Sequence, residues 1–188
     1  MGIILASGSP RRKEFFQQLG VSFRIKIPEV EEVQFENPVE TCVYNAIRKV
    51  RWVTENEEIQ NDSIIIGFDT LVSIDKNILG KPANREESRK MLQRLSGKWH
   101  RVYTGVALWK REEILKDYEM TRVKFHKLTE PQIKHYVDCG ESLDKAGSYG
   151  IQDKNISFIE RIEGSFSNVV GFPMEVTRSL LKKAGIKI

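Results

Sequence analysis

Apolar and polar positions alternate along the chain with two periods, one typical of strands and one typical of helices. Residues 3–6 form a short apolar run, and residues 21–27 place apolar side chains at every second position, which predicts two strands. Between them, Pro10 stands where a first helical residue belongs and Gly20 where a helix usually ends. The chain is therefore expected to open with a strand, a helix and a second strand.

The longest predicted helix begins after Asn37 and keeps an apolar stripe at helical spacing as far as Val53. The β-branched run that follows it, residues 63–68, is typical of a strand buried on both faces. Residues 71–74 extend this strand beyond a polar interruption at residues 69–70.

Caps and periodicity also predict elements in the rest of the chain. These are helices over residues 84–97, 129–140 and 173–185, and paired strands over residues 102–109 and 114–125. Strand–helix units together with a hairpin favour an α/β fold with a mixed sheet. No repeat, low-complexity tract or linker divides the sequence, so one domain over residues 1–188 is expected.

Composition narrows the class of protein. A hydrophobic fraction of 40% is enough for one core, and no apolar stretch approaches the roughly 20 residues that span a bilayer. Cys42 and Cys139 lie far apart without metal-site spacing, which favours a reducing, cytoplasmic setting. The formal charge of +4 suits an anionic partner without requiring one.

The first loop departs from the usual charge pattern of helix starts. With Ser9 as N-cap, Arg11 and Arg12 occupy the second and third helical positions, where negative charge is normally favoured. A bound anion would resolve this conflict, because backbone N–H groups, the Ser7 hydroxyl and two guanidinium groups all suit phosphate oxygens. The segment is therefore interpreted as a phosphate-binding loop, although two solvated arginines at an ordinary helix start would give the same pattern.

A carboxylate interrupts the buried strand. Asp69 follows residues 64–68, where a charge is costly unless it is paired, metal-bound or in contact with water. A divalent cation bridging Asp69 to a triphosphate would offset that cost, and Glu29, Glu31 and Glu32 would offer a further ligand. A strand-ending turn and an acidic surface loop are the plainer interpretations.

Three more polar residues suit a nucleotide. Lys49 borders the apolar stripe of its helix, and Lys81 is held between Gly80 and Pro82, so either ammonium group would suit a phosphate. Gln152 follows a glycine-containing stretch and offers a donor and an acceptor to a base edge. Ordinary surface lysines and a simple turn would give the same sequence patterns. The signatures of P-loop, Rossmann, zincin and α/β-hydrolase sites do not occur.

The order of these motifs along the chain resembles the Maf family of nucleotide pyrophosphatases. The matching stretches are Ser7-Gly8-Ser9-Pro10-Arg11-Arg12-Lys13-Glu14, Gly67-Phe68-Asp69-Thr70, Gly80-Lys81-Pro82, Leu95-Ser96-Gly97 with His100, Lys145 to Gln152, and Val169-Val170-Gly171-Phe172-Pro173. The resemblance covers nearly the whole chain. It implies a mixed twisted sheet flanked by helices, with a cleft between two lobes, like the inosine-triphosphate pyrophosphatases, and usually a homodimer.

The resemblance also implies a reaction and roles for residues. The family cleaves nucleoside triphosphates between the α and β phosphates with Mg²⁺ or Mn²⁺. Asp69 would accept a proton from the attacking water and contact the metal, and Glu32 would bind the metal or position water. The triphosphate would be held by Ser7, Arg11, Arg12, Lys49 and Lys81.

The stretch before Gln152 looks like the branch acting on dTTP and UTP, with modified pyrimidine nucleotides as further substrates in a housecleaning role. Arg12, Thr70 and Gln152 would determine the preferred base. Three residues depart from the family pattern. Phe68 and Val50 stand where alanine is usual, and Asp153 stands where glycine is common.

Two alternatives differ in substrate or in class. One is the same chemistry on 7-methyl-GTP or another modified nucleotide. The other is a nucleic-acid-binding or cell-division regulatory protein. Against the second, basic and acidic residues are interspersed and no aromatic–basic stacking motif is present, so no nucleic acid and no membrane is expected as a partner.

Overall fold

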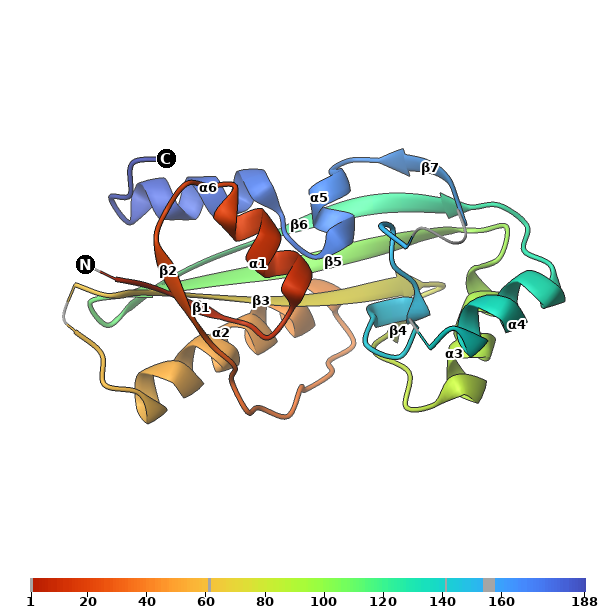
Figure 1. Ribbon diagram of the computed structural model, residues 1–188, viewed down its shortest axis with the longest axis horizontal. Coiled ribbons are helices and arrows are strands. Elements are labelled where there is room, and N and C mark those ends of the chain that lie inside the picture. The colour runs from red at the N-terminus through yellow and green to blue at the C-terminus, as the bar shows by residue number, and fades with distance from the viewer. Residues whose placement is uncertain (1, 61, 141, 154–157) are drawn as a thin grey trace. The chain divides into compact units, whose positions relative to one another are not determined.

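The computed structural model describes residues 2–60, 62–140, 142–153 and 158–188 and has a mixed α/β architecture (Figure 1). Its strands are β1 (Ile3–Ala6), β2 (Phe23–Lys26), β3 (Ile64–Ile74), β4 (Asn77–Leu79), β5 (Trp99–Lys110), β6 (Glu113–Phe125) and β7 (Ile159–Glu163). They form one 7-stranded sheet in the order β2-β1-β3-β5-β6-β7, with β4 paired to β3. The pairs β1–β2 and β1–β3 are parallel, whereas β3–β4 and β6–β7 are antiparallel, so the sheet is mixed as predicted.

The helices are α1 (Pro10–Gln17), α2 (Pro38–Asn56), α3 (Arg85–Leu95), α4 (Glu130–Asp138), the 3-10 turn η1 (Ala146–Ser148), α5 (Phe166–Val170) and α6 (Met174–Lys183). The chain folds as two compact units. Unit 1 comprises Met1–Asp69, Thr104–Glu119 and Gly171–Ile188, and unit 2 comprises Thr70–Tyr103 and Met120–Val170. The expectation of one domain over the whole chain stays a prediction.

Unit 1 is layered around β1 and β3, with α1 and α6 on one face and α2 on the other (Figure 1). Alternate residues of β1 face opposite ways, as strand geometry requires. Leu5 packs in the cluster with Phe16 of α1 and Leu181 of α6, whereas Ile4 packs with Val50 of α2. Because both faces are covered, the apolar run of β1 is continuous rather than alternating.

Unit 2 has its own core, in which α3 lies against α4 and η1. Aromatic side chains fill its centre, with Phe125 in edge-to-face contact with both His100 and Tyr149. Thr129 and Gln132 form a capping box at the start of α4.

The predicted elements are confirmed, with three differences. The residues predicted as an interruption belong to β3, which is one continuous strand. Ser9 is the N-cap of α1, but its hydroxyl makes no capping hydrogen bond, and its own N–H donates to Ser7 Oγ instead. β4, β7 and α5 were not predicted. No helix of the described residues is long and apolar enough to cross a membrane.

Candidate active site

The predicted phosphate-binding loop and Asp69 meet where β1 ends beside the middle of β3. Ala6 at the end of β1 is paired with Gly67 of β3, so Ser7 leaves β1 level with the Phe68-Asp69 segment. In open α/β sheets, ligands bind at the carboxyl ends of parallel strands. The register therefore places the two motifs together in unit 1.

Hydrogen bonds to three other residues help to hold Arg12 in one position. Its Nε donates to the carbonyl of Gly171 at 2.9 Å, and Nη1 donates to Ser7 Oγ and the Phe68 carbonyl, each at 3.2 Å. These contacts join the first loop, β3 and the stretch before α6. The resulting guanidinium fork is fixed before any substrate binds, which lowers the entropy cost of binding an anion.

The ring of Phe68 lies beneath the same guanidinium. Arg12 Cζ is 5.5 Å from the ring centroid, within the range of a cation–π contact. Phe68 is fully buried, and its ring centroid is 5.1 Å from that of Phe172. The departure from the family's alanine thus fills the core and supports Arg12.

Lys49 bridges the two predicted carboxylates. Its Nζ lies 2.6 Å from Asp69 Oδ1 and 2.7 Å from Glu32 Oε1. Asp69 is only 4% exposed, so this pairing compensates a buried charge, whereas the Glu32 side chain is 46% exposed. Five predicted residues, Ser7, Arg12, Glu32, Lys49 and Asp69, are therefore joined by direct contacts or by the strand register in unit 1.

Burial changes the acid–base properties of this group. Desolvation raises the pKa of Asp69, Lys49 opposes that shift, and Glu32 adds to it. Desolvation lowers the pKa of Arg12 to about 10, and the charges of Asp69 and Glu32 oppose that shift. Arg12 stays cationic at neutral pH, and the more basic Asp69 carboxylate is better suited to accept a proton.

Two glycines allow α2 to approach the sheet closely enough to deliver Lys49. A Cβ at Gly67 would lie 2.8 Å from Val50 Cγ2, and a Cβ at Gly105 would lie 2.5 Å from the backbone of Cys42. Val50, the second departure, therefore packs directly over β3. At both points α2 packs against the backbone of a strand, because glycine has no side chain to hold the helix away.

The acidic segment before α2 is fastened to that helix by side chains. Thr41 Oγ1 accepts from Phe35 N at 3.0 Å, and Asn45 Oδ1 accepts from Val33 N at 2.9 Å. Asn45 Nδ2 also donates to Asp69 Oδ2 at 3.3 Å. The sequence interpretation missed Asn45, although a polar amide among the buried positions of an apolar stripe was an available signal.

Arg11 lies beside Arg12 on the first turn of α1 and is half-buried. Its charge contributes to lowering the pKa of Arg12. Two like charges at a helix N-terminus with no acidic residue in the first turn favour an anion there.

The remaining predicted residues, Thr70, Lys81 and Gln152, belong to unit 2. Thr70 is half-buried on β3, and Lys81 and Gln152 are exposed. Gly147 N donates to the Gly80 carbonyl at 3.0 Å, so the segment carrying Lys81 lies against the loop that leads to Gln152.

That loop has two further anchors in unit 2. Asp153 Oδ2 accepts from the Tyr136 hydroxyl and lies 3.5 Å from Lys145 Nζ, so the third departure from the family pattern is an anchoring residue. His100 Nε2 lies 2.7 Å from the Tyr149 hydroxyl. Burial lowers the pKa of His100 to about 4, which indicates a neutral structural histidine.

Asp69 and Glu32 are two carboxylates of unit 1 that lie close enough to contact one cation. Mg²⁺ takes oxygen ligands and is commonly held by one or two carboxylates together with phosphate oxygens and water. Asp69 and Glu32 both contact the Lys49 ammonium, so their oxygens face a shared positive charge. Across the described residues, no cluster of three or more His, Cys, Asp or Glu forms a complete protein-only metal site.

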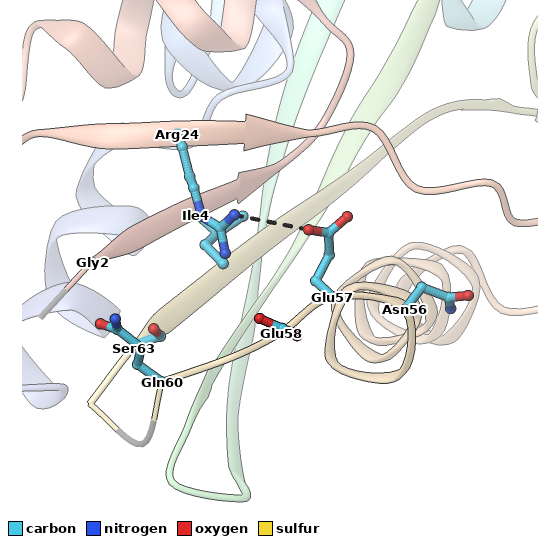
Figure 2. A pocket seen from close by; sticks show the side chains of 8 residues that line it. All are labelled: Gly2, Ile4, Arg24, Asn56, Glu57, Glu58, Gln60 and Ser63. Atoms are coloured by element: carbon cyan, nitrogen blue, oxygen red, sulfur yellow. Dashed lines mark ion pairs between the residues drawn. The ribbon is translucent and has the colours of Figure 1, made fainter.

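A hollow of about 540 Å³ in unit 1 lies elsewhere (Figure 2). Gly2 and Ser63, which precede β1 and β3, contribute to its lining, together with Arg24 and Glu57, whose charged groups face each other at 3.8 Å. It therefore lies at the amino ends of the parallel strands, opposite the group around Asp69.

Comparisons with known proteins identify relatives of this chain and a solved structure with the same fold. The chain is 46% identical over 185 residues to the dTTP/UTP pyrophosphatase of Thermotoga maritima, covering 98% of this chain and 90% of that one. It is also 46% identical over 188 residues to the dTTP/UTP pyrophosphatase of Bacillus anthracis, covering 99% and 97%. The Ham1 protein of Staphylococcus aureus shares the fold, with a TM-score of 0.52, 13% identity, and coverage of 97% of this chain and 99% of that one.

A family model described as Maf-like protein matches residues 2–184. This match spans the arginine-bearing loop, the bridged carboxylates and the stretch around Gly171. The chain belongs to the Maf family.

Proposed function

We propose that this protein hydrolyses dTTP and UTP to the nucleoside monophosphate and pyrophosphate. The observation that carries the proposal is the group in unit 1 in which a buried Asp69 bonded to Lys49 follows Phe68, whose carbonyl accepts from the fixed Arg12 guanidinium. The chain is 46% identical to two dTTP/UTP pyrophosphatases over nearly its full length, and this similarity supports the same substrates here.

In the proposed reaction, a water oxygen bonds to one phosphorus of the α–β anhydride while the bond from that phosphorus to the bridging oxygen breaks. Asp69 accepts the proton released by the water. Arg12, Arg11 and Ser7 bind phosphate oxygens at the start of α1, where the helix dipole favours negative charge. Lys49 and Lys81 add positive charge against the triphosphate.

We also propose a divalent cation, Mg²⁺ or Mn²⁺, held by Asp69 and Glu32 with phosphate oxygens completing its ligands. When bound, the ion would neutralise phosphate charge and lower the pKa of a water ligand. The two carboxylates that share Lys49 support this assignment.

Base preference is proposed to depend on Arg12, Thr70 and Gln152. The Gln152 amide offers both a donor and an acceptor, as a pyrimidine edge requires. Modified pyrimidine nucleotides such as pseudo-UTP and 5-methyl-UTP fit the same proposal. The Gln152→Ala variant should change the ratio of kcat/KM for dTTP to that for 7-methyl-GTP, and an unchanged ratio would remove Gln152 from base selection.

The family resemblance supports a homodimer, and the two free cysteines, Cys42 and Cys139, support a cytoplasmic location. Sedimentation equilibrium of the purified chain tests the first of these. A single species at 21.7 kDa would contradict a dimer.

The decisive experiment measures pyrophosphate release from dTTP, UTP, CTP, 7-methyl-GTP and ITP, with Mg²⁺ or Mn²⁺ and with or without chelator. We expect chelator-sensitive turnover that is fastest with dTTP and UTP. Faster turnover of 7-methyl-GTP would assign the chain to another substrate, and chelator-resistant turnover would contradict the proposed metal.

A further inference from the structure

Asn45 is a buried polar residue whose side chain is fully engaged. It lies on α2 with 2% of its surface exposed. Its Oδ1 accepts from Val33 N at 2.9 Å, and its Nδ2 donates to the Val33 carbonyl at 3.0 Å and to Asp69 Oδ2 at 3.3 Å. An amide nitrogen has two N–H groups, so the Asn45 amide uses both donors and its acceptor.

The geometry gives Asn45 two partners that belong to the same reaction centre. Pairing with both backbone groups of Val33 fixes the backbone next to Glu32 much as a neighbouring strand would. Its other N–H occupies Asp69 Oδ2, while Lys49 lies against Oδ1. With a donor on each oxygen, the Asp69 carboxylate has one favoured rotation.

We propose that Asn45 is the positioning residue of the pyrophosphatase site, setting the Asp69 carboxylate and the Glu32 segment in a single arrangement. This inference rests on the proposed function, because the reaction is what the arrangement serves. Asn45 contacts neither the substrate nor the attacking water in this scheme. Its effect on turnover passes through Asp69.

Thr41 provides the comparison that separates positioning from general support. It lies one turn before Asn45 on α2 and ties the same segment through Phe35, accepting from its N–H at 3.0 Å and donating to its carbonyl at 3.3 Å. Asp69 is not among the groups bonded to Thr41, whose single hydroxyl hydrogen is shared between the Phe35 carbonyl and the Asn37 carbonyl, the latter at 2.9 Å. If Asn45 only holds the segment before α2 in place, Asn45→Ala should change turnover as Thr41→Ala does. If Asn45 also positions Asp69, Asn45→Ala should lower turnover more than Thr41→Ala.

The test compares Asn45→Ala with Thr41→Ala for dTTP turnover, thermal unfolding and amide hydrogen exchange. Hydrogen-bonded partners of carboxylates at metal-dependent sites typically contribute about 10–100-fold to activity. We expect Asn45→Ala to lower kcat by that factor with KM changed less than about threefold, since substrate binding is retained. Thr41→Ala should keep kcat within about threefold of the parent. Exchange should accelerate at Val33 in the first variant and at Phe35 in the second.

An equal loss of kcat in both variants, or an unchanged kcat in Asn45→Ala, would overturn the proposal. If Asn45→Ala does not fold, Asn45→Leu keeps a side chain of similar volume and has no donor for Asp69, so the same loss of kcat is expected and retained kcat overturns the proposal. A parent protein without pyrophosphatase activity would instead contradict the proposed function. Even in an inactive protein, slow amide exchange at Val33 in Asn45→Ala would contradict the proposal that Asn45 holds the backbone next to Glu32.

Discussion

Asp69 is held on both carboxylate oxygens and is almost entirely removed from water. A buried carboxylate is costly unless it is paired, and here Lys49 and Asn45 supply the partners. The same contacts that make the charge tolerable also fix its orientation.

Replacing Asp69 by Asn keeps the shape of the side chain and removes its capacity to accept a proton. Because general base catalysis contributes about 10²–10⁴-fold, kcat for dTTP should fall by that factor. Thermal unfolding should show that the variant stays folded. Glu36→Gln, at an exposed acid of the segment before α2, is the matched control, and undiminished turnover in Asp69→Asn would remove Asp69 from the mechanism.

Arg12→Ala removes the guanidinium that the structure fixes beside Ser7. Hydrogen bonds to charged groups contribute about 1.5–3 kcal/mol, which corresponds to roughly a 10–100-fold rise in KM. Arg12→Lys restores the charge but not the planar fork and should lie between the two. The exposed neighbour Lys13→Ala serves as control, and an unchanged KM in Arg12→Ala would contradict phosphate binding by this residue.

The residues of the site were partly predictable. Asp69 was recognisable because a carboxylate followed a buried apolar run, and Arg12 because it broke the charge rule of helix starts. Lys49 looked like an ordinary residue at the edge of a stripe, and only the tertiary contacts reveal its two carboxylate partners. The polar position of Asn45 in an apolar stripe was visible, but its partners were not, because Val33 and Asp69 lie 12 and 24 positions away.

At the scale of elements, α2 connects the sheet to the site. It is the longest helix among the described residues, with Asn37 capping its start by accepting from Val39 N at 2.9 Å. Its close approach at Gly67 and Gly105 brings Asn45 and Lys49 over β3. The seating of one helix therefore sets the distances of several site residues at once.

Gly105→Ala would force a Cβ to within 2.5 Å of the backbone of α2 at Cys42. Overpacking of this kind typically costs about 1–3 kcal/mol, so the free energy of unfolding in a denaturant titration should fall by that amount. Gly80→Ala is the control, because no atom lies within 4 Å of a Cβ built there. Equal stability of the two variants would show that α2 shifts without cost.

Elements with a long run of periodic apolar positions were predictable from the sequence. Elements too short to show such a run were missed. β3 appeared interrupted because Asp69 and Thr70 break the apolar pattern, yet paired polar groups let the strand continue. β7 carries three charged residues in five positions, as edge strands often do, and gave no alternation to detect. α5 has five residues, too few for a helical stripe.

For the whole molecule, local patterns identified a mixed α/β protein but not the strand order. That order depends on connections such as β2 to β3, which pass over β1, and no local propensity encodes them. The division into two compact units likewise mixes distant segments of the chain.

The pH dependence of overall stability should include a contribution from His100. Its folded pKa is about 4 against an ordinary value of 6.5, because burial disfavours the charged ring. The unfolded state therefore binds the extra proton between these values, and the free energy of unfolding falls as pH falls through that window. The difference corresponds to about 3 kcal/mol, fully available above about pH 6.5.

Denaturant titrations between pH 4 and 7 measure this contribution as the difference between the parent protein and His100→Gln. The variant should show a shallower loss of stability on acidification. Parallel curves would mean that His100 does not titrate as its burial indicates.

The contacts of the site also differ in how far apart along the chain their partners lie. The ties from α2 to the acidic segment join residues 6 to 17 positions apart, whereas Arg12 reaches Gly171 across 159 positions. Short loops close with little entropy loss, and distant ends meet late during folding. The segment that carries Glu32 should therefore pack on α2 early in folding. Arg12 should become fixed only later, when the stretch around Gly171 has folded. During synthesis from the N-terminus, the carboxylates of the site would thus be in place well before Arg12 is fixed for phosphate binding.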